Sequence, residues 1–168
     1  MFWRLPRKEW EAGKGAGNKR KMKALVNGGR EPGVIAYADG EPIGWCAVAP
    51  RENYSGLERS RILAPIDDEP VWSVSCLFVA REYRKRGVSV RLLEEAVRFA
   101  SARGARIVEG YPVEPAANMA DAFAWTGLAS AFVKAGFRET LRRSKTRPIM
   151  RVTSARAPKR AHARAGSR

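Results

Sequence analysis

The chain has 168 residues, of which 45% are hydrophobic and 9% aromatic, and its formal net charge at pH 7 is +15. This length and this composition indicate one globular domain with a core of its own. No apolar stretch approaches the roughly 20 residues that cross a bilayer, and the first ten residues lack the apolar region of a signal peptide. The sequence therefore argues against a membrane protein, and we expect a cytoplasmic one.

The positive charge is concentrated at the two ends of the chain. Residues 1–30 carry +7 and residues 151–168 carry +6, so the long middle of the chain is nearly neutral. Basic ends favour polyanionic partners through counterion release, and they repel polycations such as polyamines. The alternative is that the basic ends serve only solubility, or that they reflect a genome rich in Arg and Ala codons.

The few cysteine and histidine residues limit the chemistry of the chain. Cys46 and Cys76 lie inside apolar, strand-like runs, a setting typical of buried free thiols. His162 is the only histidine and lies near the C-terminus, so we expect neither a histidine zinc site nor a Ser-His-Asp triad.

The first predicted elements are a helix, a hairpin and a loop. The helix covers residues 18–25, and only the short segment 2–5 precedes it as a candidate strand. Two strands, 33–38 and 43–49, flank an Asp-Gly pair, which is a strong hairpin signal. The stretch 50–70 is rich in Pro, Gly and Asp and predicts a long loop with short helical pieces.

An apolar run over residues 71–79 predicts a buried or half-buried strand, because β-branched and aromatic residues are frequent in it. After Gly87 the apolar residues follow helical spacing until Gly104, a natural end for a helix. The first N–H groups of a helix lack intrahelical partners and carry partial positive charge, so this helix start can hold a diphosphate. The alternative is an ordinary strand, turn and helix with a solvated basic turn. Four cations lie in the turn: Arg81, Arg84, Lys85 and Arg86.

Three further strands and one helix are predicted after this region. The strands cover residues 106–113, 141–144 and 149–152, and the helix covers residues 129–137. The remaining residues, 153–168, have almost no apolar bulk, so we expect a disordered basic tail.

Two segments resemble the signatures of a known enzyme family. The residues from Arg84 to Ser89 resemble the Arg/Gln-x-x-Gly-x-Gly/Ala motif of the GNAT superfamily of acetyl-CoA-dependent N-acetyltransferases, with Ser89 in the last small position. Residues 129–137 resemble the late GNAT helix that ends in Gly-Phe. The two motifs occur in the family's order, with the strand 106–113 between them.

The resemblance implies an α/β GNAT fold, with a mixed, mostly antiparallel central sheet flanked by helices. It covers residues 1–152 as one domain, followed by the tail. A GNAT domain normally opens with a strand and one or two helices. Here, either the first strand is short, or the chain begins late relative to its relatives and part of the acceptor side is missing.

The resemblance also implies how the co-substrate acetyl-CoA is held. The backbone of one strand end pairs with the pantetheine arm, an N–H there polarises the thioester carbonyl, and the basic turn holds the pyrophosphate. The amine attacks the thioester directly, so no enzyme nucleophile is needed. The residues implied for the coenzyme are Phe78, Val79, Arg84, Lys85, Arg86, Gly87, Val88, Ser89 and Val90.

The acceptor amine must lose a proton, because an alkylamine with a pKa near 10.4 is almost wholly protonated at neutral pH. Glu109 is the candidate general base, directly or through water, and the alternative is a carboxylate paired with an arginine. In this family a Tyr of the late helix often meets the leaving thiolate, and Phe132 occupies that position here. Tyr111 or Ser130 could replace it, or serve only in packing and at the helix surface.

The leading hypothesis is therefore an acetyl-CoA-dependent N-acetyltransferase that acts on a primary amine of a small molecule or protein. Two alternatives stay open. One is a basic nucleic-acid- or ribosome-associated protein, for which the charged ends argue. The other is an acetyl-CoA-binding module with little catalysis, for which the absent Tyr argues and, if the chain begins late, the missing first strand.

Overall fold

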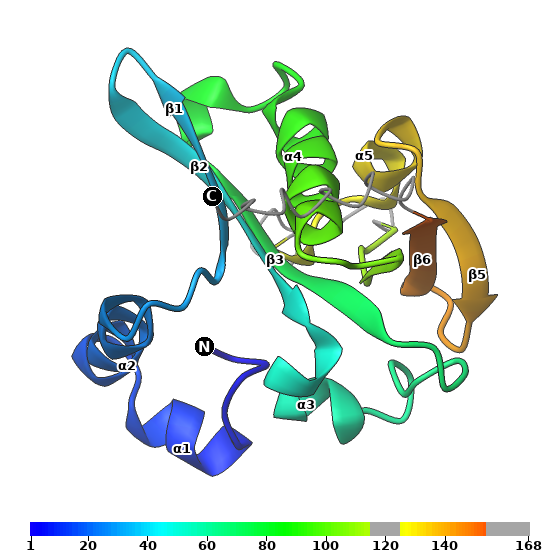
Figure 1. Ribbon diagram of the computed structural model, residues 1–168, viewed down its shortest axis with the longest axis horizontal. Helices are drawn as coiled ribbons and strands as arrows, with labels where there is room; N and C mark the ends of the chain where they lie inside the picture. The colour runs from blue at the N-terminus through cyan, green and yellow to red at the C-terminus, as the bar shows by residue number, and fades with distance from the viewer. Residues whose placement is uncertain (115–124, 154–168) are drawn as a thin grey trace, which may run out of the picture.

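The computed structural model describes residues 1–114 and 125–153, which form one mixed sheet with helices around it (Figure 1). The order across the sheet is β1-β2-β3-β4-β6-β5. Among the described strands only β3 and β4 run parallel. This confirms the expected mixed, mostly antiparallel α/β architecture. The strands are β1 (Gly33–Ala38), β2 (Glu41–Pro50), β3 (Val71–Val79), β4 (Ile107–Gly110), β5 (Arg138–Arg142) and β6 (Pro148–Thr153).

The longest helix joins the two parallel strands, as a parallel pair requires. Its apolar stripe, which includes Leu92, Leu93 and Ala96, packs against the side chains that β2 and β3 place on the same face. The helices are α1 (Arg7–Ala12), α2 (Ala16–Asn27), α3 (Ser55–Glu58), α4 (Val88–Ala102) and α5 (Ala129–Lys134), with 3-10 turns η1 (Arg51–Asn53) and η2 (Arg81–Tyr83).

The opposite face of the sheet carries a second, smaller core. Tyr54, Leu57 and Leu63, from α3 and its neighbouring segments, pack there against Tyr111 and Ile149. The stretch 50–70 is therefore a loop with short helical pieces, as predicted, and its apolar side chains cover part of the sheet.

The N-terminal region differs from the prediction. The segment 2–5 forms a turn, and no strand precedes β1 in the described residues. The helix predicted over 18–25 is present as α2, and α1 was not predicted because a helix of six residues is too short to show a helical period. Figure 1 shows both helices at one side of the molecule, away from α4 and α5. One edge of β1 is thus unpaired within the described chain.

The later strands lie close to their predicted positions, with different ends. β4 stops at Gly110, three residues before the predicted end, because β6 offers it partners only from Met150 to Thr153. β5 begins three residues earlier than predicted, and β6 includes Thr153, which the prediction gave to the tail. The rest of the predicted tail lies outside the described residues. No helix in the described ranges is both long and apolar enough to cross a membrane.

Candidate active site

The whole of β4 pairs with only the first part of β3. Val71 to Val74 lie beside Ile107 to Gly110, and beyond this point β4 has ended. On its other side β3 contains a bulge: Cys76 pairs with Ala47 and Val74 with Val48, which leaves Ser75 as the extra residue. Bulges bend a strand and increase its twist. The last residues of β3 therefore have one edge without a partner strand among the described residues.

The backbone groups on this open edge can be assigned from the ladder. The N–H of Ala80 donates to the carbonyl of Ile43 on β2 at 2.8 Å. Since backbone groups alternate sides along an antiparallel strand, Phe78 also faces β2, whereas Leu77 and Val79 face the open edge. The carbonyl of Val79 accepts a hydrogen bond from Nε of Arg84 at 3.2 Å, which agrees with this assignment.

This alternation changes the set of residues predicted to pair with the pantetheine arm. Val79 lies on the open edge and fits the prediction. The backbone of Phe78 is turned toward β2, so Phe78 does not fit, and Leu77 takes its place. The sequence alone does not show which residues of β3 turn their backbone groups toward β2, because this depends on which strand pairs with each edge of β3.

The start of α4 has the geometry of an anion site. Gly87 precedes the helix in the left-handed conformation, with φ of 78°, and no side chain caps the helix start. The carbonyl of Gly87 accepts hydrogen bonds from the N–H groups of Val90 and Arg91, at 3.0 and 3.2 Å. The preceding N–H groups, of Val88 and Ser89, are those that a helix leaves without an intrahelical acceptor. They lie where the sequence predicted them.

The basic turn surrounds this helix start with exposed cations. Arg84, Lys85 and Arg86 are exposed, and Lys85 has a positive φ of 60°. The guanidinium of Arg86 lies 5.7 Å from the ring centre of Tyr83, a cation–π contact. Lys85 and Gly87 both have positive φ, a backbone conformation that occurs in turns whose N–H groups bind anions.

Glu109 lies in a buried polar network rather than at an open surface. Its carboxylate accepts hydrogen bonds from the hydroxyl of Tyr111 at 2.6 Å, from Nη1 of Arg51 at 3.2 Å and from Nε of Arg151 at 2.7 Å. The hydroxyls of Ser73 and Tyr111 are 2.8 Å apart. Both carboxylate oxygens are thus engaged, which is the arginine-paired arrangement that was the alternative to a catalytic base. The role of Glu109 as a base stays a prediction.

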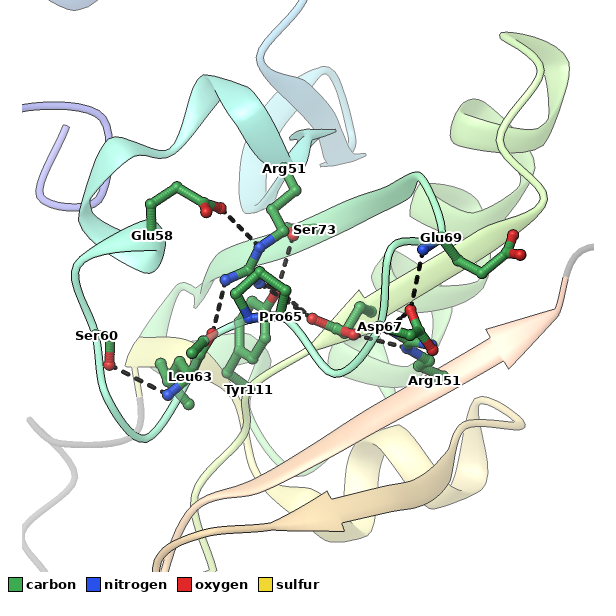
Figure 2. A network of polar contacts seen from close by, with 12 residues as sticks. Arg51, Glu58, Ser60, Leu63, Pro65, Asp67, Glu69, Ser73, Tyr111 and Arg151 are labelled. Atoms are coloured by element: carbon green, nitrogen blue, oxygen red, sulfur yellow. Dashed lines mark hydrogen bonds and ion pairs between the residues drawn. The ribbon is translucent and has the colours of Figure 1, made fainter.

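The network also fastens the segment 59–70 to the sheet, as Figure 2 shows. Arg51 donates to Glu58 at 2.8 Å and to the carbonyl of Leu63 at 2.7 Å. Arg151 binds Asp67 with two nitrogens, at 2.6 and 3.0 Å, and this contact lowers the pKa of the Asp67 carboxyl. Neither arginine was predicted to belong to the site, because their partners lie far away in the sequence.

Neither Phe132 nor Tyr111 offers a free acid for protonation of the leaving thiolate, and Ser130, the third residue considered, is exposed on α5. Phe132 is fully buried and packs edge-on against Phe137, with ring centres 4.9 Å apart. Burial and the negative charge of Glu109 raise the pKa of Tyr111 well above its ordinary value, and its hydroxyl is held by the network. Cys46 and Cys76 are free thiols, fully buried and half-buried respectively.

The family model described as "Acetyltransferase (GNAT) family" matches residues 1–124. The chain belongs to the GNAT family. The resemblance inferred from the two motifs is thereby confirmed, and the reaction class of this GNAT protein is acetyl transfer. A search of curated proteins gave no match.

Solved structures share the GNAT fold with this chain at low sequence identity. A GNAT-family acetyltransferase from Streptococcus agalactiae has a TM-score of 0.54 at 12% identity, over 88% of this chain and 79% of that one. One from Streptococcus pneumoniae has a TM-score of 0.52 at 13% identity, over 84% and 78%. A ribosomal-protein-alanine N-acetyltransferase from Brucella melitensis has a TM-score of 0.50 at 16% identity, over 82% and 76%.

Proposed function

We propose that this GNAT protein transfers an acetyl group from acetyl-CoA to a primary amine. The observation that carries the proposal is the arrangement of two sets of backbone groups: one has no partner strand among the described residues, and the other has no intrahelical acceptors. One set lies on the open edge of β3, and the other lies at the start of α4, only a short turn further along the chain. A ligand with a diphosphate at one end and amide groups along its arm matches both sets.

Each part of acetyl-CoA has a counterpart in this arrangement. The N–H groups of Val88 and Ser89, with the cations of the basic turn, hold the diphosphate. The backbone of Leu77 and Val79 pairs with the pantetheine amides, as an added strand would. An N–H of this edge donates to the thioester carbonyl oxygen, where negative charge develops as the amine attacks.

The transfer needs little acid–base assistance at the sulfur. The amine nitrogen bonds to the thioester carbon, the carbon–sulfur bond breaks, and the thiolate leaves. Because the pKa of a thiol is about 8.5, an unassisted thiolate at neutral pH costs only about 2 kcal/mol. The buried Phe132 therefore slows the reaction but does not prevent it. The amine loses its proton to water or, as first predicted, to Glu109, directly or through water.

Two glycines at opposite ends of α4 provide a matched test of the coenzyme site. Gly87 and Gly104 both have positive φ, of 78° and 90°, and a Cβ at either would meet open space. Gly87→Glu puts a carboxylate beside the proposed diphosphate, and we expect acetyl-CoA affinity, measured by calorimetry, to fall by about 100-fold, or about 2.7 kcal/mol. Gly104→Glu carries the same backbone strain and should leave the affinity unchanged. Equal affinities of the two variants would refute the site.

Contact with a polyanion is a second proposal, and α2 supports it. Lys19, Arg20, Lys21 and Lys23 are all exposed on this helix, which buries no residue. We expect two effects when these four residues are replaced by Gln, and also when residues 153–168 are deleted. The affinity for RNA should fall, and the dependence of that affinity on salt concentration should become shallower. Unchanged affinity and salt slope in both variants would end this proposal.

A further inference from the structure

A row of apolar side chains crosses three strands on the sheet face opposite α4. Leu77 and Val79 belong to the core beneath α4, so Phe78, which alternates with them, points to the other face. Phe78 is the ladder partner of Trp45 on β2, and Trp45 is the partner of Ile35 on β1. These three residues define what we call the apolar row. Partners in a ladder share a face, so the row is continuous.

The apolar row is largely uncovered in the structure. Phe78 is 54% exposed and Ile35 is 53% exposed, and Tyr37, two residues further along β1, is 62% exposed. Large apolar side chains gathered in this way on an exposed face mark a binding surface rather than ordinary surface composition. Adjacent strands are about 4.8 Å apart, so the row extends about 10 Å from Phe78 to Ile35.

One end of the row coincides with the proposed acetyl site. Phe78 lies between Leu77 and Val79, whose backbone groups form the open edge of β3. An amine that attacks a thioester bound along that edge from this face would have Phe78 as its nearest side chain. The row continues from there toward β1, away from the coenzyme, in the direction that the body of the acceptor would take.

The side chains directly beside the row on β1, β2 and β3 include no carboxylate. These side chains are those of Tyr37, Ala47 and Cys76. A polycation would find no counter-charge directly beside the row, because the carboxylate of Glu109, on the same face of the sheet, is already paired with Arg51 and Arg151.

We propose that the apolar row is the acceptor subsite, and that the acceptor is a primary amine on an aromatic or branched apolar body rather than a polyamine. This inference rests on the proposed function. The apolar body lies along Phe78, Trp45 and Ile35 and places its nitrogen at the thioester carbon. The amide bond forms there as the carbon–sulfur bond breaks, the thiolate departs with coenzyme A, and water takes the proton of the amine.

The test compares tryptamine with spermidine as acceptors, using acetyl-CoA and release of the free thiol. We expect kcat/KM for tryptamine to exceed that for spermidine by at least about tenfold, a discrimination that apolar contacts supply. Ile35→Glu should lower kcat/KM for tryptamine by about tenfold while the Kd of acetyl-CoA stays the same. Val133→Glu is the matched control, because Val133 is 61% exposed on α5, which packs against α4 on the other face.

The failure of this inference and that of the proposed function are distinguishable. Equal or faster turnover of spermidine, or full tryptamine activity in Ile35→Glu, would overturn the subsite and leave acetyl transfer standing. If neither amine is acetylated, calorimetry of tryptamine with the CoA-loaded protein decides: binding that Ile35→Glu weakens supports the subsite, and absence of binding overturns it. The proposed function is tested separately, by the coenzyme affinities of Gly87→Glu and Gly104→Glu.

Discussion

The ring of Phe132 occupies the space that a side chain on Gly110 would need. A Cβ at Gly110 would lie 2.1 Å from Cε1 of the buried Phe132 ring, far closer than non-bonded carbons approach. Gly110 is the last residue of β4, at the point where β4 and β3 part. The ring therefore packs directly on the backbone at the origin of the open edge, and it can do so only because residue 110 has no side chain.

Gly110→Ala is expected to destabilise the protein by about 1–3 kcal/mol, the usual cost of overpacking a core. The free energy of unfolding in urea measures this. Gly17→Ala is the control, because Gly17 lies in α2 and a Cβ there meets nothing within 4 Å. That variant should be neutral or more stable. The double variant Gly110→Ala with Phe132→Leu should recover part of the loss; no recovery would show that Phe132 is not the obstacle.

Glu109→Gln is expected to destabilise the protein by about 3 kcal/mol. The change removes the negative charge between Arg51 and Arg151, and breaking a buried ion pair leaves charges uncompensated. If the carboxylate is purely structural, the folded variant keeps the acidic limb of the pH profile of kcat/KM. Loss of that limb, together with a kcat lowered by about two orders of magnitude, would instead establish Glu109 as the general base.

The stability of the protein is expected to fall at alkaline pH. Burial raises the pKa of Cys46, Tyr54 and Tyr111 in the folded state. The native protein then holds these protons more tightly than the unfolded chain, so stability is full below the unfolded pKa values, near 9 and 10, and declines as pH rises above them. Each group contributes a slope of up to about 1.4 kcal/mol per pH unit.

Tyr111→Phe identifies one part of this dependence. The free energy of unfolding of this variant, measured from pH 8 to 11, should decline less steeply above pH 10 than that of the unmodified protein. At pH 8 the variant should be less stable by about 1–3 kcal/mol, because the hydroxyl contacts Arg51 and Glu109, both at 2.6 Å. Tyr37→Phe, which removes an exposed hydroxyl, is the matched control. An unchanged alkaline slope in Tyr111→Phe would contradict the assignment.

Local patterns in the sequence predicted the elements that build the coenzyme site. β3 covers residues 71–79 and α4 begins directly after Gly87, as predicted, because a β-branched run and a helical stripe are strong short-range signals. The predicted first strand at 2–5 is absent from the described residues. Strand formation there needs a partner edge, and residue patterns within a segment do not specify whether one is available.

Long-range contacts explain what the sequence did not predict. The sequence indicated Glu109 as a candidate general base. Its partners Arg51 and Arg151 are 58 and 42 residues away along the chain, so a local pattern could not reveal them. The exchange of Phe78 for Leu77 on the open edge depends on which side of β3 meets β2. Both facts follow from the topology of the sheet and not from any local pattern.

A crystal structure of the protein with coenzyme A tests the central proposal most directly. We expect the diphosphate oxygens within hydrogen-bond distance of the N–H groups of Val88 and Ser89, and the pantetheine amides paired with Leu77 and Val79. A diphosphate bound anywhere else, or an empty helix start at saturating coenzyme, would contradict it.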